Sequence, residues 1–90
     1  MSWHYIVIRH KDKKWGEFSY LIHEGYGFNK KKIPGMWTKS SVAPRGENIK
    51  ELRTDLAMML KDAVSGPIYE ERGEKLIKIK YNRVLKGKPS

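Results

Sequence analysis

Cysteine is absent from this chain of 90 residues, and its runs of apolar residues are short. The lack of cysteine excludes disulfide bonds, thiolate metal sites and a cysteine nucleophile, and it favours a reducing compartment, so we predict a cytoplasmic protein. No stretch approaches the roughly 20 apolar residues of a membrane helix, and the Met1 end lacks the apolar core of a signal peptide. We therefore expect neither membrane insertion nor export.

Acidic residues are also scarce, since ten Asp and Glu stand against 19 Lys and Arg, a formal net charge of +9. The acids are scattered over expected turns and one helix, and no two of them form a general acid-base pair. The three histidines, His4, His10 and His23, lack the further ligands that a zinc site requires. The sequence therefore predicts no enzyme, no metal site and no cofactor.

The basic residues are unevenly distributed along the chain. Residues 75–90 hold six bases and no acid, and three consecutive lysines form a second cluster. Such surfaces attract nucleic-acid phosphates through counterion release without reading base sequence. The candidate phosphate-binding residues are Lys30, Lys31, Lys32, Lys75, Lys78, Lys80 and Arg83. The alternative is that these charges only keep a small domain soluble.

Alternating β-branched and aromatic residues predict a hairpin with strands over residues 3–10 and 17–24. A symmetric hairpin has one aromatic face and one mainly aliphatic face. The aromatic face carries Trp3, Tyr5, Val7, Arg9, Phe18, Tyr20, Ile22 and Glu24. Glycines and a Pro-Gly pair predict a loop over residues 25–35, and a third strand is expected over residues 36–42.

A helix is predicted to start after Asn48, which we expect to cap it together with Glu51. Apolar residues then recur at helical spacing until the Gly66-Pro67 stop. Beyond it, Ile68 and Tyr69 predict a short strand, and residues 75–81 alternate as a half-buried strand with a basic outer face. Residues 83–90 are polar and predict a flexible basic tail.

These elements predict one α+β domain over residues 1–82, with a three- to four-stranded antiparallel sheet, one amphipathic helix on one face, and the order β-β-β-α-β. One helix covers only one face of the sheet, so the other face is expected to contact another surface. We favour the aromatic face beneath the helix because large rings bury the most area; the alternative leaves it open as a base-stacking platform. Because so short a chain buries a small core, a homodimer is possible. The candidate partner-interface residues are Trp3, Tyr5, Tyr20 and Trp37.

Two motifs resemble the HicB-type antitoxin domain: Pro34-Gly35-Met36-Trp37-Thr38 and the helix start Gly46-Glu47-Asn48-Ile49-Lys50-Glu51-Leu52. The resemblance spans about residues 3–66 and implies a reduced ribonuclease H-like sheet. Residues 39–45 are an insertion relative to the family, and Met36 stands at its Cys-like position. Antitoxins of this family mask a basic toxin, which a chain of net charge +9 fits poorly, so the resemblance implies the scaffold and not the partner.

The function that the sequence favours is a non-catalytic binding module that contacts nucleic-acid phosphates, DNA or RNA, without base specificity. The alternative is a protein-interaction module, either antitoxin-like or a phage-type inhibitor of a host defence or regulatory complex, that acts through the uncovered sheet face. Salt separates the two, because phosphate binding weakens steeply as salt rises and a packed apolar interface does not.

Overall fold

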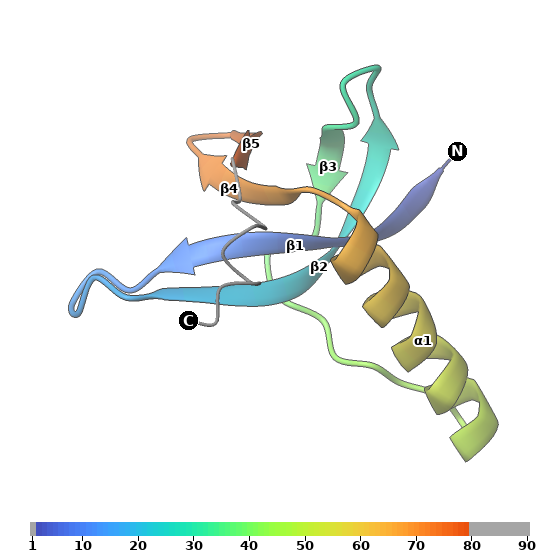
Figure 1. Cartoon of the computed structure of the whole chain (residues 1–90). Coiled ribbons are helices and arrows are strands. Elements are labelled where there is room, and N and C mark those ends of the chain that lie inside the picture. Colours follow the sequence, from blue (N-terminus) through green and yellow to red (C-terminus); the bar gives the residue numbers. More distant parts are fainter. Residues whose placement is uncertain (1, 80–90) are drawn as a thin grey trace, which may run out of the picture.

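A computed structural model describes residues 2–79 of the chain (Figure 1). It contains β1 (Trp3–Lys11), β2 (Phe18–Phe28), β3 (Pro34–Trp37), α1 (Ile49–Ser65), β4 (Ile68–Arg72) and β5 (Lys75–Ile79). The end of the predicted last strand, the tail over residues 83–90 and two candidate phosphate-binding residues, Lys80 and Arg83, lie outside the described residues.

The five strands form one sheet in the order β3-β2-β1-β4-β5. β1 pairs antiparallel with β2 and parallel with β4, while β5 folds back antiparallel onto β4. The α+β class is confirmed, but the expected three to four antiparallel strands were wrong, because the sheet is mixed and has five. Helix α1 carries the chain back across the sheet, so β4 can pair with β1 in parallel. The sequence did not predict this pairing, because alternation within a strand does not reveal the direction of its neighbour.

The strand boundaries around the lysine cluster differ from those predicted. β2 continues to Phe28 and β3 covers residues 34–37, so the expected loop over residues 25–35 and strand over residues 36–42 were misplaced. Gly27 adopts φ +62°, a left-handed conformation that glycine tolerates within the extended strand. The turn is short because the Asn29 side chain accepts hydrogen bonds from the N–H groups of Lys31 and Ile33, at 2.8 and 3.0 Å.

The two faces of the hairpin carry the residues predicted for them. Val7 lies opposite Ile22 and Arg9 opposite Tyr20, so the aromatic residues share one face. The sheet is curled (Figure 1), and side chains of the aliphatic face pack with those of β4 and β5 on its inner side. Its core consists of Ile6, Ile8, Tyr69 and Leu76, with Phe28, Ile33 and Trp37 packed against them.

Two contacts hold the curled sheet closed. The Tyr69 hydroxyl of β4 donates to the carbonyl of Lys32, which precedes β3. The Trp37 indole of β3 donates to the Glu71 carboxylate of β4 at 3.2 Å. The sheet thereby covers its own aliphatic face, an arrangement that the expectation of one helix on one face did not include.

Helix α1 has the predicted bounds and caps. The Asn48 side chain accepts a hydrogen bond from the Glu51 N–H at 2.9 Å, and the Glu51 carboxylate accepts one from the Glu47 N–H at 2.9 Å. At the other end the Gly66 N–H donates to the Asp62 carbonyl at 2.9 Å. These bonds satisfy backbone groups that a helix terminus leaves without partners.

Replacing the cap with alanine is expected to lower the free energy of unfolding by about 1 kcal/mol, because Asn48→Ala leaves the Glu51 N–H without its acceptor. Urea denaturation measures the loss, and Asn48→Asp, which keeps an acceptor, is the control. If both variants unfold at the same urea concentration as the wild type, the cap does not stabilise the helix.

The helix packs on the aromatic face but covers only one end of it. Tyr5 is buried there, with its hydroxyl donating to the Asp55 carboxylate and its N–H to the Asp62 carboxylate at 3.0 Å. Burial, and then the bond to Asp55, raise the pKa of Tyr5 to about 12. Beyond this contact, α1 projects from the sheet (Figure 1). The aromatic face is therefore covered at Tyr5 and open farther along the hairpin.

Candidate functional site

The fold brings the lysine triplet close to β5. Lys30, Lys31 and Lys32 form the turn between β2 and β3, and Lys78 lies opposite Tyr69 in the β4–β5 pair. Because the Tyr69 hydroxyl donates to the Lys32 carbonyl, the turn lies over the strand pair that carries Lys78. Alternate residues of a strand share a face, so Lys78 lies on the side of the buried Leu76, whereas Lys75, at the other end of β5, lies on the opposite side with Ile77. The expected basic outer face of this strand was therefore wrong, and the fold does not bring Lys75 together with the others. We call Lys30, Lys31, Lys32 and Lys78 the basic surface.

The lysines of the basic surface are exposed and carry unpaired charge. Within residues 2–79, the ion pairs are Lys39 with Glu71 and the pairs of Arg9 and Arg72 with Glu70. None of them involves a lysine of the basic surface. Its four charges therefore form no ion pair within the described residues and are available for an anionic ligand.

The lysine turn has a fixed backbone. Lys32 adopts φ +65°, in the left-handed region where a side chain other than glycine is strained by about 1 kcal/mol. Its N–H donates to the Asn29 carbonyl at 2.9 Å, and its carbonyl accepts from Tyr69. These bonds hold the strained backbone and fix the positions from which the three lysines extend.

The four candidate partner-interface residues do not form one surface. Trp3 and Tyr20 are 44% and 49% exposed on the outer face of the hairpin. Tyr5 is buried against α1, and Trp37 is half-buried against the inner core. The curling of the sheet separates Trp37 from the others, which the sequence pattern did not indicate.

Arg9 forms a cluster on the open part of the outer face that the sequence did not predict. Its guanidinium donates to Glu70 at 2.6 Å and lies 4.0 Å from the Phe18 ring centre. Hydrogen bonds from Arg9 and then Arg72 hold the pKa of Glu70 below its usual range. The cluster depends on the parallel pairing of Arg9 with Glu70, and no local signal in the sequence reveals that pairing.

Two of the three histidines are in contact. His23 is 1% exposed, its Nδ1 lies 2.8 Å from the Thr38 carbonyl, and its Nε2 lies 3.0 Å from the His10 Nε2. A carbonyl only accepts, so Nδ1 of His23 carries the proton and Nε2 accepts from His10. Within the described residues, no group of three His, Asp or Glu side chains could hold a metal ion. The histidine pair joins a side chain of β1 to one of β2.

Comparisons with known proteins give no identity: no family model, no curated protein and no solved structure matches this chain. The resemblance to the HicB-type antitoxin domain stays a prediction. As for membranes, residues 2–79 include no helix with both the length and the apolar character to cross one.

Proposed function

We propose that this protein is a non-catalytic binding module that contacts nucleic-acid phosphates through the basic surface. The observation that carries the proposal is the bond from Tyr69 to the Lys32 carbonyl, which places the lysine turn against the strand pair that carries Lys78. Phosphates are spaced regularly along a nucleic acid, so lysines from two neighbouring elements can contact several at once. The lysines are expected to contact phosphates and not base edges, so we expect no base specificity.

The strain at Lys32 supports the same proposal. A glycine at φ +65° would relieve the strain, and a lysine there adds a charge at the expense of backbone stability. Strained residues gather at functional sites when the surrounding structure holds them in place. The bond from the Lys32 N–H to the Asn29 carbonyl and the bond from the Tyr69 hydroxyl to the Lys32 carbonyl provide that support.

Titration of labelled single- and double-stranded DNA and RNA tests the proposal. We expect a Kd on the order of 1 to 100 μM near physiological salt and a linear fall of log K with log salt. Lys30→Glu/Lys31→Glu is expected to weaken binding at least about tenfold and to reduce the salt slope by about 2, because two phosphate contacts are lost.

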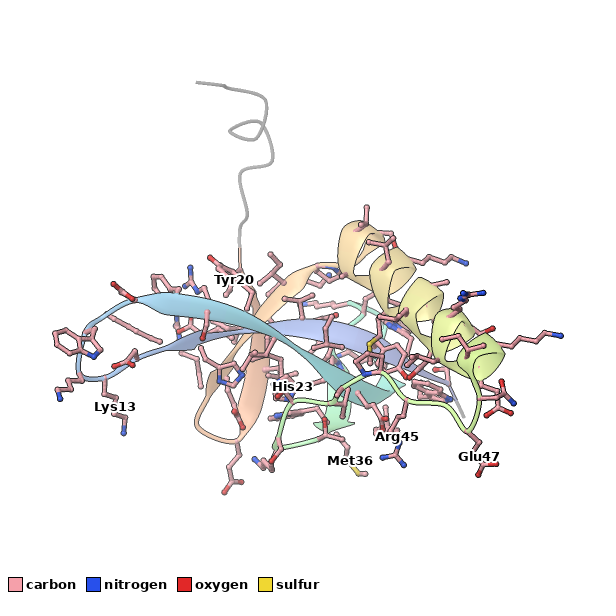
Figure 2. The ribbon with its side chains drawn as sticks, turned by 90° about the horizontal axis from the view of Figure 1, so that it is seen from below. Lys13, Tyr20, His23, Met36, Arg45 and Glu47 are labelled. Carbon is pink, nitrogen blue, oxygen red and sulfur yellow. The ribbon has the colours of Figure 1, made fainter. Side chains whose placement is uncertain are left out.

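The matched control is Lys13→Glu/Lys14→Glu, at the tip of the β1–β2 hairpin, where Figure 2 shows Lys13. It changes the net charge by the same amount at exposed positions outside the basic surface. The control is expected to bind nearly as well as the wild type. Equal weakening by both double variants would mean that total charge, and not the basic surface, attracts the nucleic acid. A wild type that binds none of the four nucleic acids would refute the proposal.

Protein binding through the outer face is the second candidate function. Phe18 and Tyr20 are 45% and 49% exposed there, beside Arg9. A partner that buried these rings would bind with little dependence on salt, in contrast to a nucleic acid. An antitoxin-like or inhibitor role, or a homodimer, would use this surface.

A further inference from the structure

Helix α1 leaves most of its apolar side chains uncovered. Met59 is the one residue of α1 that is buried. Four aliphatic side chains along the helix are 46–66% exposed, and we call them the helix stripe: Ile49, Leu56, Leu60 and Val64. Contiguous exposed apolar surface of this kind marks an interaction site more often than chance exposure.

The helix stripe faces away from the sheet. At 3.6 residues per turn, its four side chains fall within about a quarter of the helix circumference. Asp55, Met59 and Asp62, which face β1, lie about a third of a turn away. Because α1 projects from the sheet (Figure 1), a partner can reach the stripe along the length of the helix.

The acidic side chains of α1 lie on the sheet side and are used within the molecule. Asp55 and Asp62 both accept hydrogen bonds from Tyr5, and Asp55 also accepts one from the Arg45 N–H at 2.9 Å. Glu51 accepts its bond from the Glu47 N–H. None of these three carboxylates is therefore directed toward the helix stripe.

Two basic side chains of α1 lie at the helix stripe. Arg53 follows Ile49 by one turn within the stripe, and Lys61 borders it on the side opposite to Met59. Lys50 instead lines a groove with Trp3 and Tyr5 of β1. All three are exposed, and none takes part in the ion pairs found among residues 2–79. The helix therefore presents an aliphatic stripe with a basic border.

We propose that the helix stripe binds an acidic amphipathic helix of a partner protein. Such a helix would place aliphatic side chains against Leu56 and Leu60 and carboxylates against Arg53 and Lys61, in the manner of helices that dock by anchors one turn apart. The proposal is independent of nucleic-acid binding, because the basic surface lies on the β2–β3 turn and β5.

Charge and side-chain type favour this occupant over two others. In an antiparallel pair of α1 helices related by a twofold axis, the basic borders of the two copies would face each other, which disfavours a second copy of a chain with net charge +9. A nucleic acid would gain nothing from the stripe, because aliphatic side chains offer no ring on which bases stack. An acidic protein helix complements both the aliphatic stripe and its basic border.

Selection of binders from a displayed library of random helical peptides tests the proposal on the intact protein. The enriched peptides are expected to carry aliphatic residues at helical spacing and an excess of Asp and Glu. Leu56→Glu/Leu60→Glu is expected to weaken the selected peptides at least about 30-fold, as the loss of central interface contacts does. Both positions are exposed, so the variant should keep the circular dichroism spectrum and the Tm of the wild type.

The matched control is Trp15→Glu/Met36→Glu, which adds the same two charges at side chains that are 70% and 67% exposed and lie off the helix. It is expected to bind the selected peptides as the wild type does. Sedimentation and anionic-vesicle binding are measured in parallel. The proposal is overturned if selected peptides are not acidic or bind the stripe variant equally well, or if the stripe instead mediates dimerisation or vesicle binding.

Discussion

Tyr69→Ala is expected to lower the free energy of unfolding by about 3–5 kcal/mol. The Tyr69 side chain is fully buried in the core inside the curled sheet, so its removal leaves a cavity against Ile6, Ile8 and Leu76. A domain of this length has about 5–13 kcal/mol of stability in total, and the variant would lose a large part of it. Urea denaturation followed by circular dichroism measures the change.

Tyr69→Phe separates the ring from the hydroxyl. It keeps the packing and removes the bond to the Lys32 carbonyl, so a loss of about 1 kcal/mol is expected. Burial raises the pKa of Tyr69 to about 12, and the hydroxyl is therefore a donor throughout the neutral range. The surface control is Tyr20→Ala, at a half-exposed ring, where a smaller loss is expected. If Tyr69→Ala were no more destabilising than Tyr20→Ala, Tyr69 would not be the centre of the core.

Acidification from pH 7 to pH 5 is expected to destabilise the fold through His23. Burial lowers the pKa of His23 below its usual value, the bond to Thr38 opposes this effect, and the nearby His10 adds to it. Glu71 is the neighbouring carboxylate that favours the charged ring. In the unfolded chain this histidine has a pKa of about 6.5, so it binds a proton at a higher pH there than in the folded protein. The contribution of neutral His23 to stability is therefore complete above about pH 6.5 and decreases as the pH falls below it.

Thermal melts across this pH range measure the effect. The Tm of the wild type is expected to fall as the pH is lowered from 7 to 5. The Tm of His23→Gln is expected to be lower than that of the wild type at pH 7 and to change less over the same range. His4→Gln is the control, because the His4 ring stacks on Phe28, with ring centres 4.0 Å apart, while the ring that contacts His23 is that of His10. A wild-type Tm that stays constant down to pH 5 would contradict the assignment of a neutral, buried His23.

Local patterns in the sequence were sufficient for the helix and for the faces of the hairpin. The Asn48 cap, the apolar spacing and the Gly66-Pro67 stop each act within a few residues, so they predict the bounds of α1 without tertiary information. Alternation within β1 and β2 likewise determined which residues share a face. The basic residues that form the proposed phosphate contacts were also evident, because charge is a property of composition.

Contacts between distant segments decided the rest. Three features join elements that lie on either side of α1 in the sequence. They are the parallel pairing of β1 with β4, the curl that closes the sheet on its aliphatic face, and the bond from Tyr69 to Lys32, whose residues are 37 positions apart. The orientation of α1 was decided in the same way. Its spacing predicted an apolar face, but the bonds from Tyr5 to Asp55 and Asp62 turn the helix so that the stripe faces solvent. Amphipathicity specifies which side chains share a face, whereas tertiary contacts determine what that face meets.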